Sequence, residues 1–160
     1  MISREAIPEA LAKAERYRLL NDPSHAESIC LDVLRIDPEN QQAVVTLILA
    51  LADHSESLAA IERARAYVPL LASEYQRHYY TGILRERTAT AHLKQRSFGA
   101  AYSAYEALRE AMEWYERAEA LRPPGNDDAI LRWNTCARSL MANPELRPRP
   151  EERPEPILDD

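Results

Sequence analysis

Two distant stretches of this chain carry the same set of residues at the same spacing. The first set is Ala26, Cys30, Val33 and Pro38, and the second is Ala111, Tyr115, Ala118 and Pro123. Within each set the intervals are four, three and five positions, and the sets lie 85 residues apart. That separation equals two periods of about 34 residues plus 17 more, and a period near 34 is typical of arrays of helical hairpins. The spacing therefore predicts a stack of hairpins that buries a continuous core.

The composition favours helix along the whole chain. Its 160 residues include only three glycines, and no run of β-branched residues lies between turn signals. Alanine, leucine, glutamate and arginine, which are good helix formers, dominate. A chain of this length is one domain on length alone. The expected fold class is all-α, with a single domain over residues 1–142.

Charge and cysteine content exclude several classes of protein. The net charge of −6 disfavours a general nucleic-acid binder, because it leaves no overall excess of cations to neutralise phosphates. Cys30 and Cys136 fall at apolar positions of helical patterns and are expected to be buried thiols in a reducing compartment. No stretch resembles a signal peptide or a membrane span, so a cytoplasmic protein is predicted.

The first hairpin is predicted to begin near Ile7 and to turn at residues 21–23. Ser24 and Glu27 have the spacing of a capping box at the start of the second helix, which Asp37 and Pro38 end. The second hairpin opens with residues 41–51, which are apolar enough for a central helix packed on several sides. Its partner helix is predicted from about Ser57 to Val68, ending at Pro69.

The third hairpin is predicted to be overlong. One helix is expected over residues 74–94, a loop around residues 96–99 and a second helix over residues 100–121, so that the 17 surplus residues lengthen both arms. Asn126 or Asp127 is expected to cap a final helix, and such a helix covers the apolar end of a repeat array.

Residues 143–160 contain five prolines among charged residues and predict a disordered or polyproline-like tail. The tail ends in an apolar pair, Ile157 and Leu158, before two aspartates. This pair could dock onto the same chain or onto another protein, or the tail could simply stay in solvent, and these alternatives are left open.

Over about residues 7–142 these patterns resemble the tetratricopeptide repeat family. Ala14 and Tyr17 precede the first spaced set, although Cys30 stands where an aromatic is usual and no Trp-Leu-Gly signature precedes Tyr17. The second set matches better. Its accompanying glycine is taken as Gly82 rather than Gly99, because Gly99 lies in a loop-like cluster. The resemblance implies an α-α superhelix of hairpins with a C-terminal capping helix.

The resemblance also implies binding of an extended peptide or helix along a concave face, built from the first helix of each hairpin. Carried over by spacing, the candidate groove residues are Leu11, Glu15 and Arg18, then Gln42, Val45, Leu49 and Asp53, then Gln76, Tyr79, Ile83 and Arg87. The clamp by which some relatives hold chaperone C-termini needs Lys and Asn at several of these points. Its absence here argues against that specialised role.

The segment from Tyr75 to Arg96 combines cations with aromatic rings and has a single acid, Glu86. Such a segment is suited to nucleic acid or an acidic peptide. The antiparallel helix, however, is rich in acids, namely Glu106, Glu110, Glu113, Glu116 and Glu119. Charge pairing between the two arms of the hairpin is the preferred interpretation.

No pattern indicates an enzyme. The four histidines are scattered over three hairpins, and no Gly-rich phosphate loop, nucleophile elbow or paired-carboxylate motif occurs. We therefore expect no catalytic residues, cofactor or metal, and an adaptor or scaffold that binds a protein or peptide. A dedicated chaperone for a secreted client is the alternative, nucleic-acid binding through residues 75–96 is a weaker one, and homodimer formation is left open.

Overall fold

The computed structural model describes residues 1–54 and 57–150, and within them the chain is all-helical with no strand. This confirms the predicted all-α class. The helices are α1 (Ile7–Leu19), α2 (Pro23–Ile36), α3 (Gln41–Ala52), α4 (Leu58–Arg65), α5 (Glu74–Gln95), α6 (Ala100–Ala120) and α7 (Asp128–Ala142), with the short 3-10 helices η1 (Arg4–Ala6) and η2 (Val68–Leu70).

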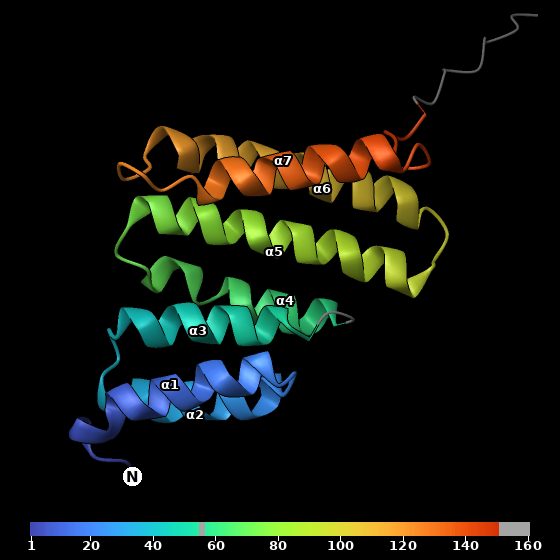
Figure 1. Ribbon diagram of the computed structural model, residues 1–160. Helices are drawn as coiled ribbons and strands as arrows, with labels where there is room; N and C mark the ends of the chain where they lie inside the picture. Colours follow the sequence, from blue (N-terminus) through green and yellow to red (C-terminus); the bar gives the residue numbers. More distant parts are fainter. Residues whose placement is uncertain (55–56, 151–160) are drawn as a thin grey trace, which may run out of the picture.

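Successive helices pack as pairs, and the pairs lie on one another in chain order. Helix α1 packs on α2, α3 on α4, and α5 on α6, while α7 covers α6. Helix α3 contacts both members of the first pair, and α4 joins the second pair to α5. Figure 1 shows the resulting stack, with the α1–α2 pair at one end and the α6–α7 pair at the other.

Helix α2 begins one residue before the predicted cap. Its N-cap is Asp22, whose side chain accepts a hydrogen bond of 3.2 Å from the backbone N–H of His25. Pro23 occupies the first helical position, where its missing N–H costs nothing, so the capping residue is the one before it. The predicted capping box of Ser24 and Glu27 is therefore wrong, and Glu27 instead pairs with Arg63 of α4.

Helix α3 is the most enclosed helix, as its apolar sequence predicts. From Ala43 to Ala52 every residue is buried except Val45 and Leu49. The large aliphatic side chains of this helix form the centre of the first core and are Val44, Leu47, Ile48 and Leu51. Asn40 caps the helix by accepting a 2.9 Å hydrogen bond from the N–H of Ala43.

Helix α4 is shorter than predicted. Ser57 is its N-cap, and the helix ends at Arg65, after which η2 forms a separate turn. Pro69 explains the early end, because it has no N–H for the carbonyl of Arg65 and disfavours helical backbone at Val68.

The third hairpin is overlong, as predicted. Helices α5 and α6 have 22 and 21 residues, whereas α1–α4 have 13, 14, 12 and 8. The two long helices meet closely at Gly82, where an added Cβ would lie 2.5 Å from Cε1 of Tyr115. Gly99 lies in the connecting loop with a φ of 76°. Gly82 is thus the glycine that helix packing requires.

The packed chain continues beyond α7. Asn126 accepts a 3.1 Å hydrogen bond from the N–H of Asp128 at the start of this helix. After the helix, Leu146 is buried, and the Arg149 guanidinium contacts Glu106 and Ser103 of α6 at 3.2 and 3.0 Å. Contacts therefore extend past the predicted boundary at residue 142. The remainder of the predicted tail, including Ile157 and Leu158, lies outside the described residues.

Candidate functional site

One stripe of α3 reaches solvent, and it coincides with residues predicted to bind a partner. Between the helix start and its C-cap, the incompletely buried positions are Gln41, Gln42, Val45, Leu49 and Asp53. Their spacing places the last four on one side of the helix. Together with Glu15 and Arg18 of α1 and Gln76, Tyr79 and Arg87 of α5, these four residues form what we call the front face.

Ionic contacts join the three helices of the front face at one end. Asp53 accepts from Arg18 Nε at 2.8 Å and lies 3.7 Å from Arg87 Nη2. Arg18 also pairs with Glu15 at 3.4 Å, and Glu15 accepts a 3.0 Å hydrogen bond from the Thr46 hydroxyl. The Arg18 and Asp53 side chains are 19% and 18% exposed, so water screens their interaction only in part. The Arg18–Asp53 contact thus joins α1 to α3, and Arg87 of α5 adds a longer contact to the same carboxylate.

A hollow of about 290 Å³, open to solvent, lies over this network. Arg18, Asp53 and Arg87 form its charged part, and Leu19 and Asn21 complete the lining. The Leu19 side chain is strongly exposed on its rim. The hollow thus offers both signs of charge and an apolar edge to a ligand side chain.

An aromatic group borders the apolar part of the front face. Tyr79 lies 5.9, 5.1 and 5.9 Å, between ring centroids, from Tyr75, Tyr80 and Tyr115. Leu49 of α3 packs against the same cluster. Burial raises the pKa of Tyr80 to about 12, and burial likewise raises the pKa of Tyr75. Both hydroxyls therefore remain protonated at neutral pH and can donate hydrogen bonds.

Two predicted groove residues belong to the core instead. Leu11 and Ile83 are each only 2% exposed, so neither can contact a partner in this conformation. Leu11 packs with Ile7, Val33 and Ala43, and Ile83 packs in the cluster around Tyr115. Helical spacing predicts which side of a helix a residue lies on, and packed neighbours cover that side at these two positions.

The remaining predicted residues are spread along the front face. Gln42 and Gln76 lie in the first turns of α3 and α5, whereas the ionic network lies beyond the middle of α5. Val45 and Leu49 connect the two regions along α3. The face is therefore an elongated surface with amides at one end, apolar side chains along α3 and charges at the other end.

Sequence reasoning missed a polar cluster between α5, α6 and α7. The Tyr115 hydroxyl donates a 2.5 Å hydrogen bond to Glu86, and Arg132 Nη1 lies 3.6 Å from the same carboxylate. Burial is the main cause that raises the pKa of Tyr115, and burial together with Glu86 raises the pKa of Cys136 to about 12. Glu86 is the single acid of the basic segment 75–96, and this isolated acid is the sequence feature that could have indicated the cluster.

Three arginines of α5 contact groups of the same chain. Arg85 forms the predicted ion pair across the hairpin, 2.8 Å from Glu110. Arg77 instead donates to the carbonyls of Leu71 and Ala72, and Arg87 pairs with Asp53 of α3. These internal partners reduce the cationic surface that nucleic-acid binding would need.

Two of the histidines lie against aromatic rings. His25 stacks on Tyr17 at 4.4 Å, and His78 lies 5.4 Å from the Trp114 ring. Over residues 1–54 and 57–150, no three His, Cys, Asp or Glu side chains are grouped to hold a metal ion. The part of the chain that the structure describes also has no helix long and apolar enough to cross a bilayer.

Comparison with models of protein families, with curated proteins and with solved structures gives no match for this chain.

Proposed function

We propose that this chain is a protein-interaction adaptor or scaffold that binds an extended peptide or a helix along its front face. In this proposal the hairpin stack is a tetratricopeptide-type superhelix, and the front face is its concave surface. The observation that carries the proposal is the accessible stripe of α3, where Val45 and Leu49 are incompletely buried on a helix that is otherwise enclosed.

The chemistry of the front face suits a peptide with mixed side chains. Gln42 and Gln76 can each donate and accept hydrogen bonds, as an extended peptide backbone requires. Val45, Leu49 and the Tyr79 ring provide apolar contact for one or two anchor side chains. At the other end, Arg87 lies 3.7 Å from Asp53, which is beyond hydrogen-bond distance, so its guanidinium keeps N–H donors for a carboxylate of the ligand.

A peptide display library selected against the immobilised chain tests the proposal. The double variant Gln42→Ala with Arg87→Ala removes polar groups of the face without opening the core. The matched control, Glu62→Ala with Arg65→Ala, removes an exposed acid and base that pair on α4. We expect the first variant to weaken binding of selected peptides at least about tenfold, corresponding to ~1.4 kcal/mol, and the control to leave it unchanged.

The proposal fails if no peptide is enriched, or if both variants bind the enriched peptides as the wild-type chain does. Circular dichroism of each variant verifies that the helices remain folded. Tyr79→Ala adds an independent test of the aromatic part of the face.

A further inference from the structure

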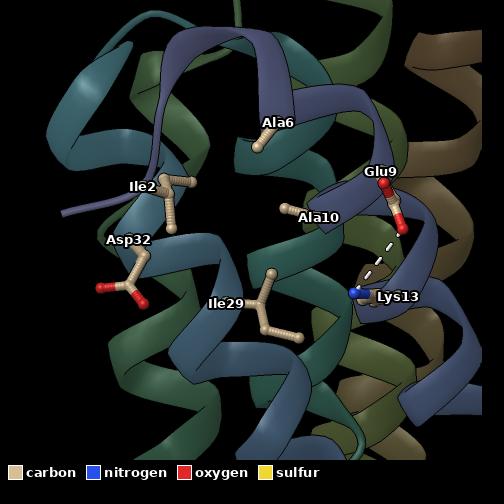
Figure 2. A pocket seen from close by; sticks show the side chains of 7 residues that line it. All are labelled: Ile2, Ala6, Glu9, Ala10, Lys13, Ile29 and Asp32. Carbon is tan, nitrogen blue, oxygen red and sulfur yellow. Dashed lines mark ion pairs between the residues drawn. The ribbon is translucent and has the colours of Figure 1, made fainter.

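The α1–α2 pair has an apolar groove on the side that α3 does not cover. Ile2, Ala6, Ala10 and Ile29 line it, and Figure 2 shows their side chains around a shared space. Its volume is about 250 Å³. Glu9 and Lys13 lie along one rim, and Asp32 lies on the other. In Figure 1 this pair is the last one at its end of the stack.

A protruding leucine lies at the opposite end of α1. Leu20 is 69% exposed, and it lines a second hollow with Lys13, Arg16 and Tyr17. Lys13 lines both hollows, so they adjoin each other along the helix. One surface therefore carries an apolar recess near the start of α1 and an apolar projection at its end.

Charge is also polarised along this side of α1. The acids Glu5 and Glu9 come first, and the bases Lys13 and Arg16 follow. Lys13 lies 3.7 Å from Glu9 of its own chain. If two copies of α1 align antiparallel with Leu20 of one against Ala6 of the other, the helical rise places Arg16 of each copy beside Glu9 of the other. A parallel alignment would place acid against acid and base against base, which is unfavourable.

We propose that two copies of this chain associate through α1, antiparallel and about a two-fold axis, with Leu20 of each copy in the Ile2–Ala6–Ala10–Ile29 groove of the other. A two-fold contact is self-complementary, so Leu20 of each copy can enter the groove of the other copy at the same time. The front-face residues of α1, Glu15 and Arg18, line neither hollow. The dimer thus leaves two front faces accessible.

Sedimentation equilibrium of the full chain tests this proposal, over a concentration series from about 1 to 200 µM, which spans weak and moderate dissociation constants. We expect a monomer–dimer equilibrium in this range. Leu20→Glu and Ala10→Glu should each weaken it about tenfold or more, because each places a charge in an apolar contact. Leu131→Glu is the matched control, since Leu131 is 62% exposed on α7 at the other end of the stack.

A charge exchange tests the antiparallel alignment separately. Glu9→Lys should weaken the dimer roughly threefold to tenfold, because it puts lysine beside the partner's Arg16 at a solvent-exposed contact. Adding Arg16→Glu should restore the wild-type constant. Helical content and melting temperature of every variant verify the fold.

Three results would overturn the proposal. The first is a wild-type chain that stays monomeric throughout the series. The second is a dimer that Leu20→Glu and Ala10→Glu do not weaken more than Leu131→Glu does. The third is a double exchange that fails to restore an association weakened by Glu9→Lys. None of these results bears on peptide binding by the front face.

Discussion

The two larger cores of the described residues are built from different side chains. The core around α3 is aliphatic, with Val44, Leu47, Ile48 and Leu51 at its centre. The core around α6 combines alanines with tyrosine rings. Tyr115 is completely buried there, lies against the backbone of Gly82, and donates its hydroxyl hydrogen to Glu86.

This difference predicts two kinds of sensitivity to substitution. Aliphatic side chains pack without directional bonds, so the core around α3 depends on total volume. The ring of Tyr115 requires both the missing Cβ of Gly82 and an acceptor for its hydroxyl. The core around α6 therefore depends on the identity of particular residues.

The largest effect is expected for Gly82→Val. Its Cβ would overlap the Tyr115 ring, so the free energy of unfolding should fall by more than about 3 kcal/mol, beyond the typical cost of overpacking. Urea unfolding measures this loss. In a Tyr115→Ala background the same substitution should cost much less, and equal costs in both backgrounds would contradict the fitted packing of these two residues.

The next effect is expected in the aliphatic core. Leu47→Ala removes a completely buried side chain and should lower the free energy of unfolding by about 3 kcal/mol, whereas Leu47→Met should cost less than about 1.5 kcal/mol. Thermal or urea unfolding compares the two variants. A Met variant as unstable as the Ala variant would show that this core also depends on shape rather than volume.

A smaller effect is expected for Tyr115→Phe. The ring remains, but the Glu86 carboxylate loses its hydrogen-bond donor, so about 2 kcal/mol of stability should be lost. Urea unfolding of this variant beside Tyr105→Phe, a partly exposed tyrosine of the same helix, isolates the effect of the hydroxyl. Equal stabilities of the two variants would show that the hydrogen bond from Tyr115 to Glu86 does not stabilise this core.

The smallest effect is a loss of folding stability at alkaline pH, and it involves one cysteine thiol in each of these cores. Burial raises the pKa of Cys30 and of Cys136 from 9.0 to about 12. Because these pKa values are raised in the folded state, the stabilising contribution is complete below about pH 9 and is lost as the pH rises toward 12. At pH 10 each thiol should reduce the free energy of unfolding by about 1 kcal/mol relative to pH 8.

Unfolding of Cys30→Ala and Cys136→Ala across this pH range measures the thiol contribution. Each variant should show a shallower alkaline decline than the wild-type chain. A decline identical in all three proteins would mean that the thiols ionise without unfolding.

Patterns along single helices predicted much of this fold. The repeated spacing predicted the order of the hairpins, and the 17 surplus residues predicted the long third hairpin. The helical spacing of Gln42, Val45, Leu49 and Asp53 predicted the accessible side of α3. These features depend on helical periodicity and chain length, which are visible in the sequence.

Features set by contacts between helices were not predictable in the same way. Pro23 moved the cap of α2 to Asp22, and neighbouring helices cover Leu11 and Ile83. Likewise, the contact of Glu86 with Arg132 depends on how α7 lies against α5. Periodicity assigns a residue to one side of a helix, but the packing angle decides whether that side is covered.

The central claim, that the front face receives the partner, is tested most directly by methyl NMR spectra recorded with and without a peptide from the display selection. We expect the methyl signals of Val45 and Leu49 to shift on binding, while those of Leu31 and Leu70, which are exposed on α2 and η2, keep their positions. Shifts confined to Leu31 and Leu70, with Val45 and Leu49 unchanged, would contradict the claim.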